Sequence, residues 1–108
     1  MASGAIVQFR PTVGMNFETV TVTNAIAVGL TASKFKPSGQ VAAETAFITV
    51  EDGPVRYRYD GTDPTTTIGH KATSGTTLLL RGEQQMSLFK VIATTATNGT
   101  LTSTYERE

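Results

Sequence analysis

The acidic side chains near the middle of the chain are the first candidates for chemistry. There are four of them: Glu51, Asp52, Asp60 and Asp63. Calcium sites need several carboxylate and carbonyl oxygens that converge in one loop, and residues 60–63 offer two carboxylates three positions apart. The full spacing of a calcium-binding loop is absent. We therefore expect Asp60 and Asp63 to accept hydrogen bonds from their own turn backbone, and we predict no metal site.

The second candidate for chemistry is His70, the only histidine. A catalytic triad would need a nearby serine and an acid, and Ser74 is close in the sequence, but no nucleophile-elbow motif surrounds any serine. The chain has no cysteine, which excludes thiol catalysis, zinc–thiolate sites and disulfides. The glycines are scattered and do not form a phosphate-binding loop. We predict a non-enzymatic protein with no catalytic residues and no cofactor, in which His70 is a loop residue or a hydrogen-bonding strand end.

Arginines and tyrosines alternate in the segment 55–59, VRYRY. Basic and aromatic side chains on one surface are typical of proteins that bind single-stranded nucleic acid. Neighbouring residues of a strand point to opposite faces, however. We therefore expect Tyr57 and Tyr59 to point to the core with Val55, and Arg56 and Arg58 to point to water or to a partner. The nine basic and nine acidic residues are also unclustered, so nucleic acid is not an expected partner.

Short strands must position these side chains, and the clearest pair surrounds residues 51–54. Phe47, Ile48 and Val50 form a β-type run, and the alternating segment 55–60 follows after Gly and Pro. This pattern predicts a β-hairpin. Residues 60–65 form a turn in which Gly61 is expected to adopt a conformation that most other residues avoid.

Further strands are predicted at residues 5–9, 17–23, 26–30, 41–50, 76–81, 87–94 and 100–105. A loop is predicted at 34–39, and residues 41–46 also fit a helical turn. In the 17–23 strand, alternation places Phe17 on one face and Val20 and Val22 on the other. Asn98 and Gly99 predict a type I′ hairpin turn between the last two strands.

These seven or eight short strands, with twenty threonines, predict an all-β fold. We expect a single domain over residues 1–108, an antiparallel β-sandwich or a jelly-roll-like arrangement. No apolar run approaches the ~20 residues that cross a bilayer, and the first residues lack a signal-peptide pattern. We expect synthesis in the cytoplasm, with no membrane partner.

The segment from Val55 to Thr65, VRYRYDGTDPT, resembles a segment of small structural proteins of tailed bacteriophages. In those proteins the segment looks like V-R-Y-x-x-D-G-T-x-P-T. The resemblance continues through Gly69-His70, the leucines at 78–80, Phe89-Lys90 and a closing hairpin at 98–101, and covers residues 47–105. It implies a virion β-sandwich protein such as a capsid decoration protein, a head fibre or a tail accessory protein. Other virion proteins would be its partners, and the virion its location.

The shorter segment from Tyr59 to Thr65 also resembles the fibronectin-III-like modules appended to chitobiases and other carbohydrate-active enzymes. That resemblance implies an accessory module that binds carbohydrate or another protein. The chain has no tryptophan and three tyrosines, at 57, 59 and 105, to offer a sugar. We keep this function as the alternative to a virion role.

Contacts between copies are expected from the strand edges and the net charge. Lys and Pro usually protect an edge from pairing, and segments 17–23 and 100–105 contain neither. A formal net charge of zero gives little repulsion between copies. We predict homo-oligomers or docking on a capsid or tail, with residues 1–11 as an N-terminal contact arm.

Overall fold

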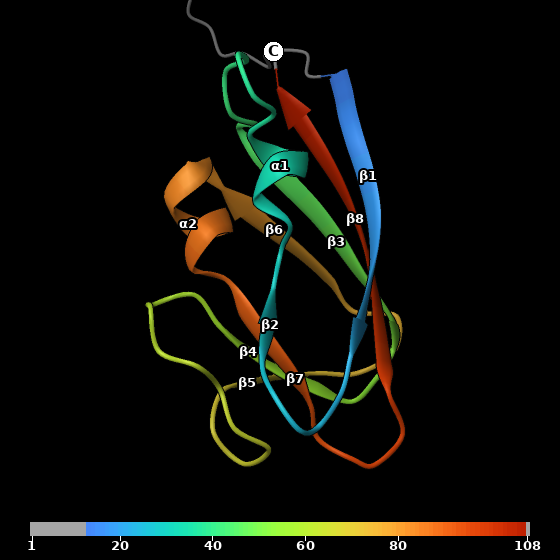
Figure 1. The fold of residues 1–108 in the computed structure, drawn as a ribbon. Helices are drawn as coiled ribbons and strands as arrows, with labels where there is room; N and C mark the ends of the chain where they lie inside the picture. The colour runs from blue at the N-terminus through green and yellow to red at the C-terminus, as the bar shows by residue number, and fades with distance from the viewer. Residues whose placement is uncertain (1–12, 108) are drawn as a thin grey trace, which may run out of the picture.

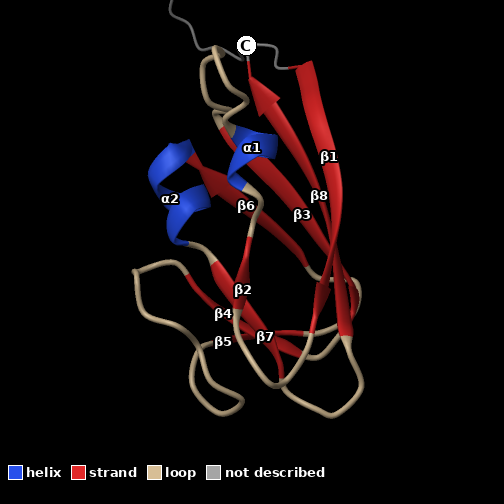
Figure 2. Ribbon diagram, in the orientation of Figure 1, coloured by secondary structure: helices blue, strands red, loops and turns tan. Residues whose placement is uncertain are grey.

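The computed structural model describes residues 13–107, in which eight strands form two antiparallel four-stranded sheets (Figures 1 and 2). Sheet A has the order β1-β8-β3-β6 and sheet B the order β2-β7-β4-β5. The strands are β1 (Val13–Val22), β2 (Val28–Gly29), β3 (Thr45–Asp52), β4 (Val55–Arg58), β5 (His70–Ala72), β6 (Thr77–Arg81), β7 (Lys90–Ala93) and β8 (Gly99–Arg107). The all-β sandwich is confirmed. The predicted strand at 5–9 and the whole predicted contact arm at 1–11 lie outside the described residues.

The long strands of sheet A follow the alternation expected of a strand with one buried face. In β1, Val22 is buried and Val20 packs against the core, while Phe17 is 56% exposed, so the predicted facing is confirmed. β8 buries Leu101 and Tyr105 and turns its threonines outward. β8 lies between β1 and β3, so the strand nearest the C-terminus is central in its sheet.

The predicted hairpin around residues 51–54 is wrong, because β3 and β4 belong to different sheets. Gly53 and Pro54 form the corner where the chain crosses from sheet A to sheet B, through a cis peptide bond. The N–H of Gly53 donates to Ser74 Oγ at 2.9 Å, and the carbonyl of Pro54 accepts from the N–H of Thr94 at 3.2 Å. A sandwich corner needs the same turn residues as a hairpin, so local pattern alone does not separate the two.

The type I′ turn predicted at Asn98-Gly99 is also wrong, because β7 lies in sheet B and β8 in sheet A. Gly99 is not among the described glycines with positive φ. Glycine is required here because there is no space for a side chain. A Cβ at this position would lie 2.9 Å from the carbonyl oxygen of Asp52 and 2.9 Å from Val55 Cγ1. The two crossings between the sheets therefore touch at this glycine.

Two short helices replace segments predicted as loop or strand: α1 (Ala32–Phe35) and α2 (Gly82–Leu88). The strand predicted at 87–94 is shorter in the structure, where it is β7. The strand predicted at 41–50 begins only at Thr45, because residues 41–44 are neither strand nor helix. α1 and α2 bury Phe35 and Met86 at the end of the sandwich, where they extend the core (Figure 1). Two helical turns are too short to show a clear period in the sequence.

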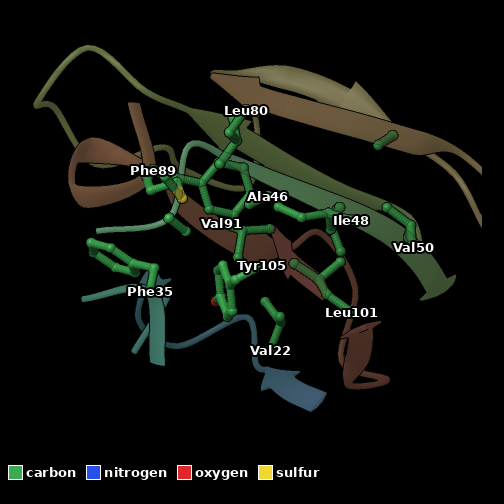
Figure 3. Close-up of a cluster of buried hydrophobic side chains, with 14 of the residues drawn as sticks. Val22, Phe35, Ala46, Ile48, Val50, Leu80, Phe89, Val91, Leu101 and Tyr105 are labelled. Atoms are coloured by element: carbon green, nitrogen blue, oxygen red, sulfur yellow. The ribbon is translucent and has the colours of Figure 1, made fainter. Parts of the chain in front are cut away.

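The core lies between the sheets and is centred on Tyr105 and Phe89 (Figure 3). The ring of Tyr105 packs 6.0 Å from that of Phe35, centroid to centroid. Only one face of the leucine-rich β6 is buried: Leu80 is 3% exposed, whereas Leu79 is 48% exposed. The strand predicted at 76–81 is confirmed, but the three leucines do not make it a buried strand, because β6 is an edge strand whose outer face lies in solvent.

A carboxylate at the rim of the core connects three elements. The hydroxyl of Tyr105 donates to Glu18 of β1, which also accepts from the N–H of Thr31 at 3.0 Å and from its hydroxyl at 2.7 Å. Thr31 is the residue that precedes α1. Burial, and then the hydrogen bond to the carboxylate, raise the pKa of Tyr105 above its ordinary value. Glu18 thus holds β1, β8 and the start of α1 together.

Candidate functional site

The turn after β4 is built around Asp60. Arg58 donates two hydrogen bonds to its carboxylate, from Nε at 3.0 Å and from Nη2 at 2.5 Å, and the N–H of Thr62 donates a third at 3.3 Å. The hydrogen bond from Arg58 holds the pKa of Asp60 below its ordinary value. Gly61 has φ of +92°, which confirms its predicted conformation. The turn role predicted for Asp60 is confirmed, and no such bond to Asp63 is seen in the described part of the chain.

The four acidic residues do not converge on one point. Glu51 and Asp52 end β3, and Glu51 accepts a hydrogen bond from the Thr102 hydroxyl at 3.1 Å. Asp60 and Asp63 lie in the loop that follows β4. Within residues 13–107 there is no group of three or more His, Cys, Asp or Glu side chains placed to hold a metal ion.

His70 is the first residue of β5, and Ser74 lies in the turn that follows this strand. Ser74 accepts a hydrogen bond from the N–H of Gly53 at the sheet corner. His70 packs instead between two aromatic rings, with centroids 5.3 Å from Tyr57 and 6.3 Å from Tyr59. The structure therefore does not bring the histidine and the serine together, and their positions favour structural roles for both.

In segment 55–59 the facing predicted for Tyr57 is confirmed, the facing predicted for Tyr59 is wrong, and Arg56 is covered by a loop and not open to water. Tyr57 packs against the core, 5.8 Å from Phe89, and burial raises its pKa. Tyr59 is 42% exposed, because β4 ends at Arg58 and the alternation ends with it. Arg56 does not reach out into water: it is half-buried, and its Nη1 donates to the carbonyl of Gly69 at 2.8 Å. Arg56 thus fastens the loop 59–69 to the sheet.

One small hollow gathers the side chains that the alternation was expected to separate. Arg58, Tyr59, Asp60 and His70 line an open hollow of about 150 Å³ at the edge of sheet B. The rings of Tyr59 and His70 are stacked at 28°. Because β4 ends at Arg58, the strand alternation does not continue to Tyr59, and both side chains line the same hollow. The expectation that arginine and tyrosine do not share a surface is therefore wrong at this point.

The largest unexpected feature is the outer face of sheet A. The register of the four strands places Phe17, Thr104, Phe47 and Leu79 side by side in one row across the sheet. Phe17, Phe47 and Leu79 are 56%, 45% and 48% exposed. We call these four residues the apolar row. The helices and sheet B lie on the opposite side of sheet A, so no described element covers this row (Figure 1).

A second row lies next to the apolar row, two residues further along each strand. It consists of Thr19, Thr102, Thr49 and Thr77, and we call it the threonine row. Alternation in the sequence already indicates that Phe17 points away from Val20 and Val22. Placing it in line with Phe47 and Leu79 requires the order and register of strands that are distant in the chain, which no local pattern contains.

None of the helices within residues 13–107 has the length and apolar character needed to cross a membrane. Comparisons of the chain with protein-family models, with curated proteins and with solved structures gave no match.

Proposed function

We propose that the chain is a non-enzymatic structural protein of a bacteriophage particle, in the role of a capsid decoration or auxiliary head protein that acts through contacts with other proteins. The observation that supports this role is the uncovered apolar row on sheet A. The resemblance of residues 47–105 to small phage structural proteins supplies the kind of particle. The virion is the corresponding location, and other virion proteins and further copies are the partners.

An exposed apolar row is unusual on a protein that works alone. Scattered exposed apolar residues are normal, but contiguous exposed apolar patches mark sites of interaction. Three large side chains from three different strands are aligned here, and Thr104 lies between two of them. β1 is an edge strand of sheet A and contains neither Lys nor Pro to prevent pairing with another chain. Both features suit assembly better than catalysis.

The test uses virions of the phage that encodes the chain. Mass spectrometry should find the protein in purified particles, and purified protein should cosediment with particles from which it is missing. A triple variant, Phe17→Thr, Phe47→Thr and Leu79→Thr, should reduce cosedimentation at least tenfold, because it removes the apolar contact and retains residues suited to strands. A protein absent from virions and without affinity for them would refute the proposal.

The matched control for this variant changes three other exposed apolar residues to threonine. Ile26, Val41 and Ile68 are 66%, 74% and 56% exposed and lie in loops, outside the strands of sheet A. The control variant loses the same number of apolar side chains, so it should cosediment like the wild type. Equal losses in both variants would mean that general surface hydrophobicity, and not this face, determines the binding.

The alternative function, an accessory module that binds carbohydrate, is favoured by the hollow beside His70. Arg58 and Asp60 neutralise each other there, so the hollow suits an uncharged ligand. The ion pair still offers hydrogen-bond donors and acceptors for hydroxyl groups, and the stacked rings of Tyr59 and His70 offer a flat apolar wall. The volume, about 150 Å³, is comparable to cavities that accept one six-membered ring.

This alternative is tested by titrating the ¹⁵N-labelled protein with methyl glycosides of glucose, galactose and N-acetylglucosamine. A sugar-binding module should show amide shifts around residues 58–70 that disappear in Tyr59→Ser and persist in the exposed loop control Ile68→Ser. Inorganic phosphate should give no such shifts, because the ion pair leaves no free positive charge in the hollow. Absence of shifts with every sugar would eliminate this function.

A further inference from the structure

We infer that the outer face of sheet B binds an extended, carboxylate-rich segment of another protein. This inference rests on the proposed function, since it names the chemistry of one of the virion proteins that the chain would contact. The core lies between the two sheets, so the outer face of sheet B points away from the apolar row on sheet A. The two faces would therefore receive different partners.

The charges of the described residues are divided unequally between the two sheets. The strands of sheet B contain four basic residues and no acidic one: Arg56 and Arg58 in β4, Lys71 in β5 and Lys90 in β7. The strands of sheet A contain four acidic and two basic residues. The formal net charge of zero thus conceals a positive sheet B. The sequence does not show this grouping, because the basic residues come from three separate strands.

The register places the four basic residues on one face, in two pairs. Lys71 lies directly opposite Arg56, and Lys90 lies directly opposite Arg58. Both pairs lie on the same side of the sheet, because their two arginines are two residues apart in β4. This side is the outer one, since Val55, which alternates with Arg56, is buried in the core.

Most of these charges have no counter-charge. Like charges that face each other across neighbouring strands destabilise a sheet. Arg58 is neutralised by its ion pair with Asp60, whereas Arg56 donates to a backbone carbonyl. Within residues 13–107, Arg56, Lys71 and Lys90 form no ion pair. The fold thus retains a repulsive arrangement that its own packing does not require, as is typical of a surface that function maintains at the expense of stability.

The surroundings favour the carboxylates of a protein over the phosphates of a nucleic acid. Binding to nucleic acid depends on many concentrated basic residues, and only three are uncompensated here. Asp60 and Asp63 border the face, the first at Arg58 and the second in a hollow that reaches Ile92 of β7. They would repel a continuous phosphate backbone. A protein segment can instead place carboxylates at the lysines and uncharged side chains elsewhere.

The spacing of the two lysines indicates an extended segment. Lys71 and Lys90 are two strands and two residues apart in the register. At ~4.8 Å between strands and ~3.4 Å between residues, this corresponds to about 12 Å. In an extended segment, alternate side chains point to the same side at intervals of ~7 Å, so two carboxylates four residues apart span ~13 Å. A segment with acidic residues at alternate positions can therefore reach both lysines at once.

The experiment titrates the ¹⁵N-labelled full chain with a ten-residue peptide in which glutamate alternates with serine. At low salt the amides of Lys71, Lys90 and their neighbours should shift. The dissociation constant should rise ~5-fold or more between about 20 and 200 mM salt, because salt screens exposed charges. The same peptide with glutamine in place of glutamate is the neutral control and should cause no shift.

A pair of double variants locates the binding. Lys71→Gln with Lys90→Gln should weaken peptide binding ~10-fold, because it removes both uncompensated lysines. The matched control, Lys34→Gln with Lys36→Gln, removes the same charge at α1 and should bind like the wild type. Lys71→Gln alone should also raise the melting temperature by about 1–4 °C, since it removes the like charge opposite Arg56. A fall in melting temperature would show that this lysine serves the fold, and would overturn the inference.

Three binding results would also overturn it. The first is the absence of amide shifts on the outer face of sheet B, and the second is equal binding by the two double variants. The third is tighter binding of a ten-residue thymidine oligonucleotide than of the peptide, which would identify the partner as nucleic acid. If Lys71→Gln left peptide binding unchanged and made the chain self-associate, the lysine would only protect the edge of β5 from pairing, and the inference would fail as well.

These outcomes separate from those of the proposed function. A protein that cosediments with virions through the apolar row, but does not bind the acidic peptide, would keep the virion role and lose the acidic partner. A protein that binds the peptide through Lys71 and Lys90, but is absent from virions and has no affinity for them, would keep the acidic partner and lose the virion role.

Discussion

Replacing Tyr105 by phenylalanine tests how the sandwich is held together at its helical end. The substitution keeps the buried ring and its contact with Phe35, and it removes only the hydroxyl that donates to Glu18. Any loss of stability therefore reports on one hydrogen bond. This bond joins β8, the central strand of sheet A, to the edge strand β1.

The expected loss follows from what Glu18 retains. A hydrogen bond to a charged group contributes ~1.5–3 kcal/mol, and the larger losses occur when the charged partner is left buried and alone. Glu18 keeps two hydrogen bonds from Thr31 and is partly open to water. We therefore expect Tyr105→Phe to lower the free energy of unfolding by about 1–2 kcal/mol. Glu18→Ala should cost more, because it removes three hydrogen bonds and leaves the Tyr105 hydroxyl without its acceptor.

The assay is urea unfolding followed by circular dichroism, with Tyr105→Phe, Glu18→Ala and the double variant forming a cycle. The losses of unfolding free energy in the two single variants should add up to about 1–2 kcal/mol more than the loss in the double variant. This difference is the energy of the hydrogen bond that both single variants remove. Tyr59→Phe is the matched control, since this exposed hydroxyl has no hydrogen bond within the described residues, and it should change stability by less than ~0.5 kcal/mol. Additive losses would show that the Tyr105–Glu18 bond contributes nothing to stability.

Three further predictions concern the corner, the alkaline limit and metal ions. Gly99→Ala should destabilise the fold by ~1–3 kcal/mol in the same assay, because the added Cβ would overlap the Asp52 carbonyl and Val55. Gly14→Ala is the control and should be tolerated, because the nearest atom to its added Cβ is Thr104 Cγ2 at 3.6 Å. The raised pKa of Tyr105 stabilises the fold below the ordinary tyrosine pKa of 10.0, so melting temperature should fall as pH rises beyond that value, and less steeply in Tyr105→Phe. A chelator should leave the melting curve unmoved; a shift of several degrees that calcium restores would contradict our prediction of no metal site.

Local pattern predicted strand content and facing where a strand is long and half-buried. In β1 the alternation placed Phe17 and Val22 on the correct faces, because one buried face imposes a period of two. It failed where a strand is about to end, as at Tyr59, and where a turn changes sheet, as at Gly53 and Gly99. A corner and a hairpin use the same residues, and only long-range pairing distinguishes them.

The two candidate surfaces could not be predicted from the pattern of any single segment, for a related reason. The hollow beside His70 depends on the pairing of β4 with β5 and on the end of β4 at Arg58, and the apolar row depends on the register of four strands. The exposure of Phe17 was readable in the sequence, but its alignment with Phe47 was not. What could be read at this site was the turn itself, since Asp60 and Gly61 carry their own local chemistry.

The central position of β8 has a consequence for how the protein is made. Synthesis runs from the N-terminus, so β1, β3 and β6 leave the ribosome before the strand that pairs with both β1 and β3. Until β8 arrives, β1 has no partner in sheet A, and the core side of β3 lacks Leu101 and Tyr105. The growing chain is therefore exposed to aggregation through unpaired strand edges. A stalled or clipped chain without residues 99–107 would lose both pairings that β8 makes and would retain only the β3–β6 pair of sheet A.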